Sequence, residues 1–175
     1  DSIELNSCLP NPIHNNEYFY FEDESIYIHV LRLTALTIDS SYQDIIQKIA
    51  ESSAMNVTME EYENLSENEK KDKVREYVKE YTFSKASIKG DARIRSKAIS
   101  QEDHANDKRP RPAQNIDINR NCLTFDTPRQ LLDCAIKICN HNAFGGGAAR
   151  IKNGFSNSYK VASKGYHYRT LMLNL

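Results

Sequence analysis

The chain has 175 residues, of which 39% are hydrophobic and 27% are charged, and its formal net charge is −1. This length suits one domain of ordinary size, and the composition is that of a folded chain. The sequence has no apolar run close to the ~20 residues that a membrane-spanning helix needs, and no basic and then apolar leader. We therefore expect no membrane partner. The cysteine usage described below favours an intracellular protein, most simply a cytoplasmic one.

The small net charge conceals a division of charge along the chain. Residues 1–84 contain 7 Lys and Arg against 17 Asp and Glu, a net of −10, whereas residues 85–175 contain 16 against 7, a net of +9. A basic half of this kind favours phosphate groups as partners, from a nucleotide or a nucleic acid. The alternative is that the two halves pack against each other or against other protein subunits.

The cysteines indicate neither a disulfide scaffold nor a zinc site. The 4 cysteines (Cys8, Cys122, Cys134 and Cys139) are irregularly spaced, which favours free thiols in a reducing compartment. On a helix Cys134 and Cys139 would lie about 140° apart around the axis, so they would not face one ion.

The segment 25–38 is apolar and fits two patterns. Ile26, Ile28 and Val30 alternate as in a strand, while Ile26, Val30 and Leu33 follow the spacing of a helix stripe. We favour the helix. The next segment, 41–53, is a clearer helix, with apolar residues at helical spacing: Tyr42, Ile45, Ile46 and Ile49.

Two capping boxes predict the starts of two further helices. In Thr58-x-x-Glu61 and Ser66-x-x-Glu69, the hydroxyl and the carboxylate can each accept from an amide that the helix leaves unpaired. The second of these helices should extend over 67–81 and bury one face, made of Val74, Tyr77, Val78 and Tyr81. Residues 1–84 are therefore expected to form an acidic, mainly helical region.

The pattern changes near Lys85. Residues 87–95 predict a short strand or turn, 101–115 a polar loop, and 116–125 a strand with Asp117 near its start. Thr127-Pro128-x-Gln130 predicts a capped helix, which should bury Leu131, Leu132, Ala135, Ile136 and Cys139 and end before the glycines 145–147. Strands over 149–155 and 168–175 would follow. The predicted fold class is α+β, a helical first half followed by a mixed β-sheet with flanking helices.

Three groups of residues in the basic region are candidates for phosphate chemistry. Asp117 could hold a divalent ion that bridges phosphates, or it could form a salt bridge to Arg120 or to a neighbouring Lys. In Arg93-Ile94-Arg95 and Arg150-Ile151-Lys152, strand geometry would point both basic side chains to one face as an anion clamp. The alternative for both pairs is an exposed basic face that contacts the acidic helices.

Several stretches, in this order, resemble the RelA/SpoT-like nucleotidyltransferase domain of the (p)ppGpp synthetases, most closely its divergent versions in unicellular eukaryotes. They are Lys89-Gly90-Asp91-Ala92-Arg93-Ile94-Arg95-Ser96, Asp117-Ile118-Asn119-Arg120 with Phe125-Asp126-Thr127-Pro128, Arg150-Ile151-Lys152-Asn153 and Gly165-Tyr166-His167-Tyr168-Arg169. The resemblance covers about 84–175. It implies a nucleotidyltransferase-like domain over 85–175 that continues beyond Leu175, with residues 1–84 beside it or part of it.

The resemblance also implies roles for individual residues. Asp117 would be the catalytic residue and the magnesium ligand in a pyrophosphoryl transfer from ATP. Phosphates would be held by Arg93, Arg95, Lys97, Arg120, Arg150, Lys152 and Arg169, and a base would stack on Tyr166 or Tyr168. The second acidic residue of the family, in a Glu-x-Gln-x-Arg strand, has no counterpart within the 175 residues.

Three functions follow as hypotheses. The first is binding of a nucleotide such as ATP, GTP or GDP. The domain would use magnesium if it is active, or it would be a catalytically degenerate relative of the synthetases. The second is an inactive structural or interaction module of a larger assembly. The third is RNA binding through the basic residues, with Tyr166 and Tyr168 as stacking groups. The acidic half argues against this last hypothesis because it would repel a long polyanion.

Overall fold

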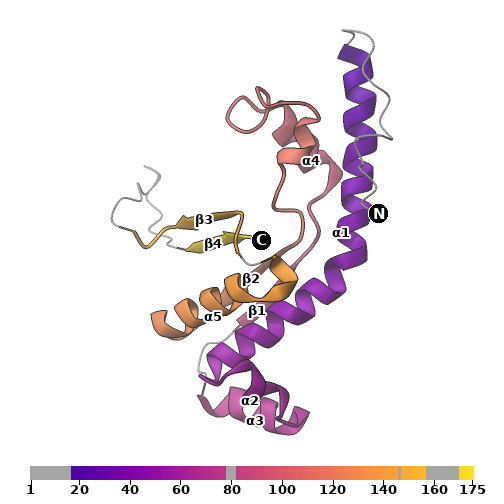
Figure 1. The fold of residues 1–175 in the computed structure, drawn as a ribbon. Helices are drawn as coiled ribbons and strands as arrows, with labels where there is room; N and C mark the ends of the chain where they lie inside the picture. The colour runs from indigo at the N-terminus through magenta and orange to yellow at the C-terminus, as the bar shows by residue number, and fades with distance from the viewer. Residues whose placement is uncertain (1–16, 78–81, 146, 157–169) are drawn as a thin grey trace. The chain divides into compact units, whose positions relative to one another are not determined.

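The structure is a computed structural model that describes residues 17–77, 82–145, 147–156 and 170–175. The first half is helical, with α1 (Glu17–Ala54), α2 (Met59–Glu63) and α3 (Glu67–Tyr77). The second half mixes helices and strands: β1 (Thr82–Ala86), α4 (Asp91–Ile99), η2 (Arg111–Gln114), β2 (Arg120–Thr124), α5 (Pro128–Asn140), η3 (Asn142–Phe144), β3 (Arg150–Asn153) and β4 (Leu171–Asn174) (Figure 1). The predicted α+β class is confirmed.

The described strands are divided between two small sheets. β1 pairs with β2, and β3 pairs with β4. The second pair is antiparallel, with Ile151 opposite Leu173 and Lys152 opposite Met172. Side chains opposite each other in such a pair point to the same face, so Ile151 and Leu173 share one face and Lys152 and Met172 the other.

The chain is organised in two compact units, and each is built from two separate segments. Unit 1 contains residues 1–40 and 86–120, and unit 2 contains 41–85 and 121–175. The boundaries fall within α1, at the end of β1 and at the start of β2. Each unit therefore combines a segment of the acidic region 1–84 with a segment of the basic region 85–175.

The core of unit 1 joins the first part of α1 to α4 and to the loop before β2. It contains Ile28, Ala35, Ile94 and Ile118, with Leu31 and Ile88 packed against it. The predicted helix over 25–38 is confirmed, but its buried face differs from the predicted stripe. Ile26, Val30 and Leu33 are 53%, 40% and 52% exposed, because Ile28, Leu31 and Ala35, on the opposite side of α1, make the contact with the core.

The core of unit 2 joins the second part of α1 to α5. Its buried residues are Ile46, Ile49, Ala50, Cys134 and Ile138, and the predicted stripe of Tyr42, Ile45, Ile46 and Ile49 is confirmed. The predicted face of α5 was partly wrong. Leu132 and Ile136 are exposed, whereas Cys134, Ala135 and Ile138 are buried, because α5 is rotated so that this other edge meets α1.

All three predicted capping boxes are present. Thr58 with Glu61 and Thr127 with Gln130 exchange the two expected bonds, and Ser66 and Glu69 do the same at the start of α3. Val74 is half-buried, and the part of that predicted helix over 78–81 lies outside the described residues.

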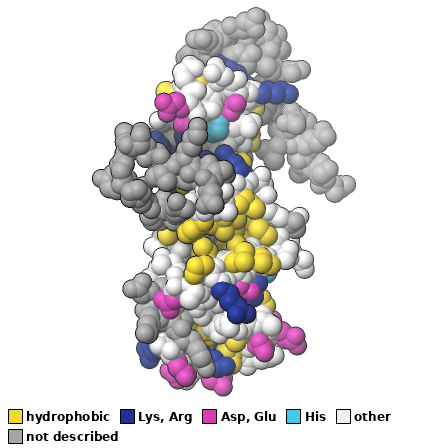
Figure 2. Space-filling view, turned by 90° about the vertical axis from the view of Figure 1, so that its left-hand side faces the viewer, with side chains coloured by type: hydrophobic (Ala, Val, Ile, Leu, Met, Phe, Trp, Pro, Cys, Tyr) yellow, Lys and Arg dark blue, Asp and Glu magenta, His cyan; other side chains and the backbone are white. Residues whose placement is uncertain are grey.

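Some hydrophobic side chains stay at the surface of unit 2. Figure 2 shows hydrophobic side chains, in yellow, gathered on one face of the molecule (Figure 2). The large exposed ones of unit 2 are Leu132, Ile136, Ile151, Phe155 and Met172. In the part of the chain that the structure describes, no helix combines the length and the apolar character required to cross a bilayer.

Candidate anion site around Asp117

The loop before α4 and the loop before β2 bring Lys89 and Asp117 together within unit 1. The backbone amide of Lys89 donates to the carbonyl of Ile118 at 3.0 Å, and Ile118 is buried in the core. This backbone bond places the ammonium of Lys89 against the carboxylate of Asp117, where it donates to Oδ1. The Lys89 side chain is only 2% exposed, whereas that of Asp117 is 33% exposed.

The position of Asp117 differs from the predicted one. The strand expected over 116–125 is confirmed only as β2, Arg120–Thr124, so Asp117 lies in the loop that precedes it. Asn119 ties this loop to α1, since its amide donates to the carbonyl of Ala35 at 2.9 Å and to Asp39 at 3.0 Å. Of the two alternatives for Asp117, the structure contains the salt bridge, with Lys89 as its partner.

Two further cations lie near this pair. Lys97 has its Nζ 4.0 Å from Oδ2 of Asp117 and 3.6 Å from Oδ1 of Asp103. Both distances exceed those of hydrogen bonds, so the attraction to each carboxylate is electrostatic. The guanidinium of Arg120 donates to the carbonyl of Ser87 at 3.0 Å, and its charge acts on Lys89.

The cations determine how the pair titrates. Burial alone would raise the pKa of Asp117, but the hydrogen bond and charge of Lys89 and the charge of Lys97 hold that pKa below its ordinary value. Burial lowers the pKa of Lys89, Asp117 opposes this shift, and the charges of Lys97 and Arg120 reinforce it. Burial is thus the main cause of the lowered pKa of Lys89, and the positive charges of Lys97 and Arg120 add to it.

The short strand or turn expected over 87–95 is wrong from Asp91 onward, because α4 begins at that residue. On a helix Arg93 and Arg95 point in different directions, so the proposed clamp between them was wrong. Arg93 instead shares a face with Lys97, four residues further on. Arg95 is bonded to Asp91 at 2.6 Å and to the Ser25 hydroxyl at 2.7 Å, so its guanidinium is committed to the structure of unit 1.

The other predicted phosphate ligands belong to unit 2 or are not described. The strand predicted over 149–155 is present as β3, and Arg150 and Lys152 lie on its exposed surface. They share the face opposite to that of Leu173, which packs on the core of unit 2. Arg150 donates to Asn174 at 3.1 Å. Tyr166, Tyr168 and Arg169 lie outside the described residues, so the stacking hypothesis rests on the sequence alone.

Magnesium does not fit the arrangement at Asp117. Magnesium prefers oxygen ligands, usually one or two carboxylates together with phosphates and waters. Here an ammonium contacts one oxygen of the carboxylate and a second ammonium faces the other. Within residues 17–77, 82–145, 147–156 and 170–175, no three His, Cys, Asp or Glu side chains are grouped so that they could hold a metal ion.

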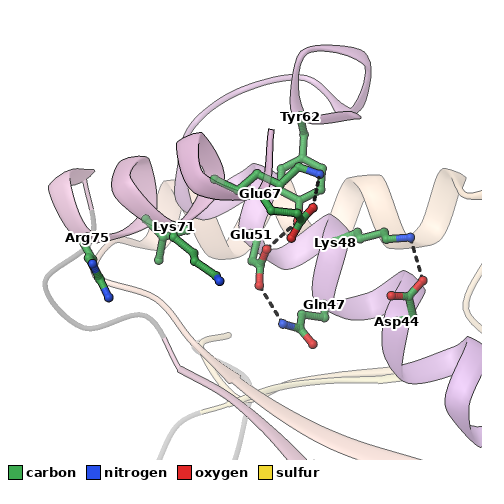
Figure 3. Close-up of a pocket in the computed structure, with 10 residues that line it drawn as sticks. Asp44, Gln47, Lys48, Glu51, Tyr62, Glu67, Lys71 and Arg75 are labelled. Carbon is green, nitrogen blue, oxygen red and sulfur yellow. Dashed lines mark hydrogen bonds and ion pairs between the residues drawn. The ribbon is translucent and has the colours of Figure 1, made fainter. Parts of the chain in front are cut away.

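Unit 2 contains a pocket of about 450 Å³ between α1, α2 and α3. Figure 3 shows polar and charged side chains of its lining bonded to one another: Glu51 accepts from Gln47 at 2.8 Å and from the Tyr62 hydroxyl at 2.5 Å, and Lys48 pairs with Asp44 (Figure 3). Cations and carboxylates nearly balance along its lining, which is made of Asp44, Gln47, Lys48, Glu51, Tyr62, Glu67, Lys70, Lys71, Val74 and Arg75. The pocket therefore has an excess of one positive charge, with its four cations set against three carboxylates, and it includes none of the predicted site residues.

Sequence reasoning missed one central residue, Lys89. It was part of a stretch that resembles the family, but no role was assigned to it, because nothing in its spacing points to a carboxylate 28 residues away. Only the pairing of Lys89 with Ile118 reveals the contact.

No family model, curated protein or solved structure matches this chain.

Proposed function

We propose that unit 1 binds the phosphate groups of a nucleotide such as ATP, GTP or GDP, as a catalytically degenerate relative of the (p)ppGpp synthetases. The observation that carries this proposal is the group of cations at Asp117: Lys89 in contact with it, and Lys97 and Arg120 beside the pair. Arg93 adds a further positive charge on the Lys97 face of α4. The RelA/SpoT-like resemblance implies phosphate contacts for three of these residues, Arg93, Lys97 and Arg120, and none for Lys89.

The chemistry of such a site is charge neutralisation. A phosphate group carries negative oxygens that accept hydrogen bonds, and Lys and Arg supply charged donors. Lys97 is about one-fifth exposed and Arg120 is exposed, so both can meet a ligand from solvent. The partly exposed Asp117 would orient Lys89 and limit how closely an anion approaches.

Calorimetric titration of ATP, GTP and GDP in buffer with magnesium tests this proposal. We expect one of them to bind and Lys97→Met to weaken it by about tenfold, the loss of a charge-assisted hydrogen bond. Arg129→Met is the matched control, since it removes one exposed positive charge from unit 2. Equal weakening by both variants, or no binding of any nucleotide, would refute a specific site in unit 1.

A second candidate function is assembly through the exposed face of α1. Between residues 26 and 41 the exposed side chains include Ile26, Val30 and Leu33 and contain no Lys, Arg, Asp or Glu. The spacing of four and three residues is that of a helix-pairing seam. A neutral seam does not repel a copy of itself, so its partner would be the same face of a second chain.

Sedimentation velocity tests this candidate, with Leu33→Glu as the disrupting variant. Leu132→Glu is its control, because Leu132 is also an exposed leucine and lies on α5. Apolar pairing should persist at high salt, whereas pairing of the acidic and basic regions between chains should weaken. A monomer at all salt concentrations would remove this candidate.

A further inference from the structure

The carboxylate of Asp117 already has a cation in contact with it, and that cation belongs to the chain. The ammonium of Lys89 donates to Oδ1, and Nζ of Lys97 lies 4.0 Å from Oδ2. A divalent ion bound to Oδ1 would have to displace the ammonium of Lys89, and one bound to Oδ2 would have to approach the ammonium of Lys97. The arrangement thus opposes metal binding by steric occupation and by repulsion.

Lys89 is fixed in this place by the fold. Its backbone amide is bonded to Ile118, its side chain is 2% exposed, and its ammonium lies 3.5 Å from the side-chain oxygen of Asn115. Asn115 is itself buried and donates to the carbonyl of Pro112 at 3.3 Å. The contact between Lys89 and Asp117 is therefore part of the architecture and does not depend on a ligand.

We propose that Lys89 is the built-in counter-ion of Asp117, in the place of a divalent ion, and that the site binds the pyrophosphate group of a nucleotide without a metal. This inference rests on the proposed function and adds its mode of binding. Lys89 neutralises Asp117, and Asp103 lies 3.6 Å from Lys97. The two positive charges of Arg93 and Lys97 then outnumber the one negative charge of Asp103. The excess positive charge is then available to phosphate oxygens.

Titration of inorganic pyrophosphate in EDTA, and then in magnesium, gives the first test. We expect binding in EDTA at least as tight as in magnesium, because magnesium neutralises pyrophosphate in solution. Lys97→Met should weaken the binding in EDTA by about tenfold. Added salt should weaken it further, since the ligand is held by charge.

A pair of variants isolates the role of Lys89. Lys89→Met alone leaves the negative charge of Asp117 uncompensated inside an anion site, so pyrophosphate should bind about tenfold more weakly in EDTA. Lys89→Met combined with Asp117→Leu removes both charges and should restore most of that affinity. Circular dichroism and thermal unfolding establish that each variant is folded, and Asp117→Asn, which keeps the shape of the side chain, is the substitute if the double variant is not.

A metal site would give the opposite pattern. If Asp117 were a magnesium ligand, pyrophosphate would bind only with magnesium, and the double variant or Asp117→Asn would abolish that binding. This result would overturn the counter-ion role and leave the proposed function intact. Absence of binding in both buffers would overturn both proposals, and binding in EDTA with the expected loss and restoration would support both.

Discussion

Glu24 and Arg111 lie 87 residues apart in the sequence and form a two-pronged ion pair within unit 1. Nε of Arg111 donates to Oε1 of Glu24 at 2.8 Å, Nη2 donates to Oε2 at 2.7 Å, and the backbone amide of Arg111 donates to Oε1 at 3.1 Å. Glu24 is buried. One carboxylate of the acidic region is therefore used within unit 1 to hold η2 against α1.

Glu24→Gln should destabilise unit 1 because it leaves Arg111 without its charged partner. Removing one member of a buried pair costs about 3 kcal/mol of the free energy of unfolding. Urea unfolding at pH 7, followed by circular dichroism, measures the loss. An unchanged midpoint would mean that the pair contributes nothing to stability.

The same pair gives a pH dependence with a defined sign. Burial would raise the pKa of Glu24, but the hydrogen bonds and charge of Arg111 outweigh burial and hold that pKa below its ordinary value of 4.5. The stabilisation is therefore present above pH 4.5 and is lost as the pH falls through the lower folded-state pKa. The difference in unfolding free energy between wild type and Glu24→Gln should shrink over that acid range, and a constant difference would contradict the assignment.

Arg93 and Arg95 should respond differently to replacement by alanine. Arg95→Ala removes the bonds to Asp91 and Ser25, so it should lower stability by about 1 kcal/mol and leave phosphate affinity unchanged. Arg93→Ala should leave the thermal midpoint unchanged and weaken phosphate binding. Thermal unfolding and calorimetry of both variants distinguish the roles, and a reversed assignment would contradict the geometry of α4.

The start of α5 depends on Thr127. Its hydroxyl accepts from the amide of Gln130 at 3.3 Å, and the Gln130 side chain also donates to the carbonyl of Ala54 at 2.8 Å. Thr127→Ala should lower the unfolding free energy by about 1 kcal/mol, whereas Thr127→Ser should keep most of it. Chemical unfolding of the two variants is the measurement, and equal losses would show that the hydroxyl is not responsible.

The described cysteines should differ in reactivity. Burial raises the pKa of the Cys134 thiol to about 12, so it holds almost no thiolate at pH 8. Cys122 is exposed. Iodoacetamide followed by peptide mass mapping should label Cys122 in the native chain and Cys134 only after unfolding. Equal labelling rates in native buffer would mean that α5 does not protect Cys134.

Local signals predicted much of the fold. The capping boxes at Thr58, Ser66 and Thr127 depend on residues three apart, so they were readable from the sequence and are confirmed. The faces of α1 and α5 were harder because both helices carry apolar residues on more than one side. Only the contacts with α4 and with α1 decide which side is buried, and these contacts join distant segments.

The candidate site could be predicted only in part, because its contacts also join segments that are distant in the sequence. Asp117 and Lys97 stand out in the sequence as a lone carboxylate and a basic cluster. The partner of Asp117 could not be inferred, because Lys89 reaches it through a backbone pairing with Ile118. Asp91 and Arg95 are four residues apart, so their pair was detectable, but only once residues 91–99 were recognised as a helix.

The interleaving of the two units constrains the order in which a ribosome could complete them. The core of unit 1 cannot form around Ile28 until Ile94 and Ile118 have been synthesised. The core of unit 2 cannot form around Ile46 until Cys134 and Ile138 have been synthesised. The segment 41–85 is synthesised between the two parts of unit 1. Because α1 precedes both α4 and α5 in the chain, it leaves the exit tunnel before these two partners have been synthesised. During synthesis its apolar faces are available to chaperones, and a break after Ser84 would give two fragments, neither of which contains a whole unit.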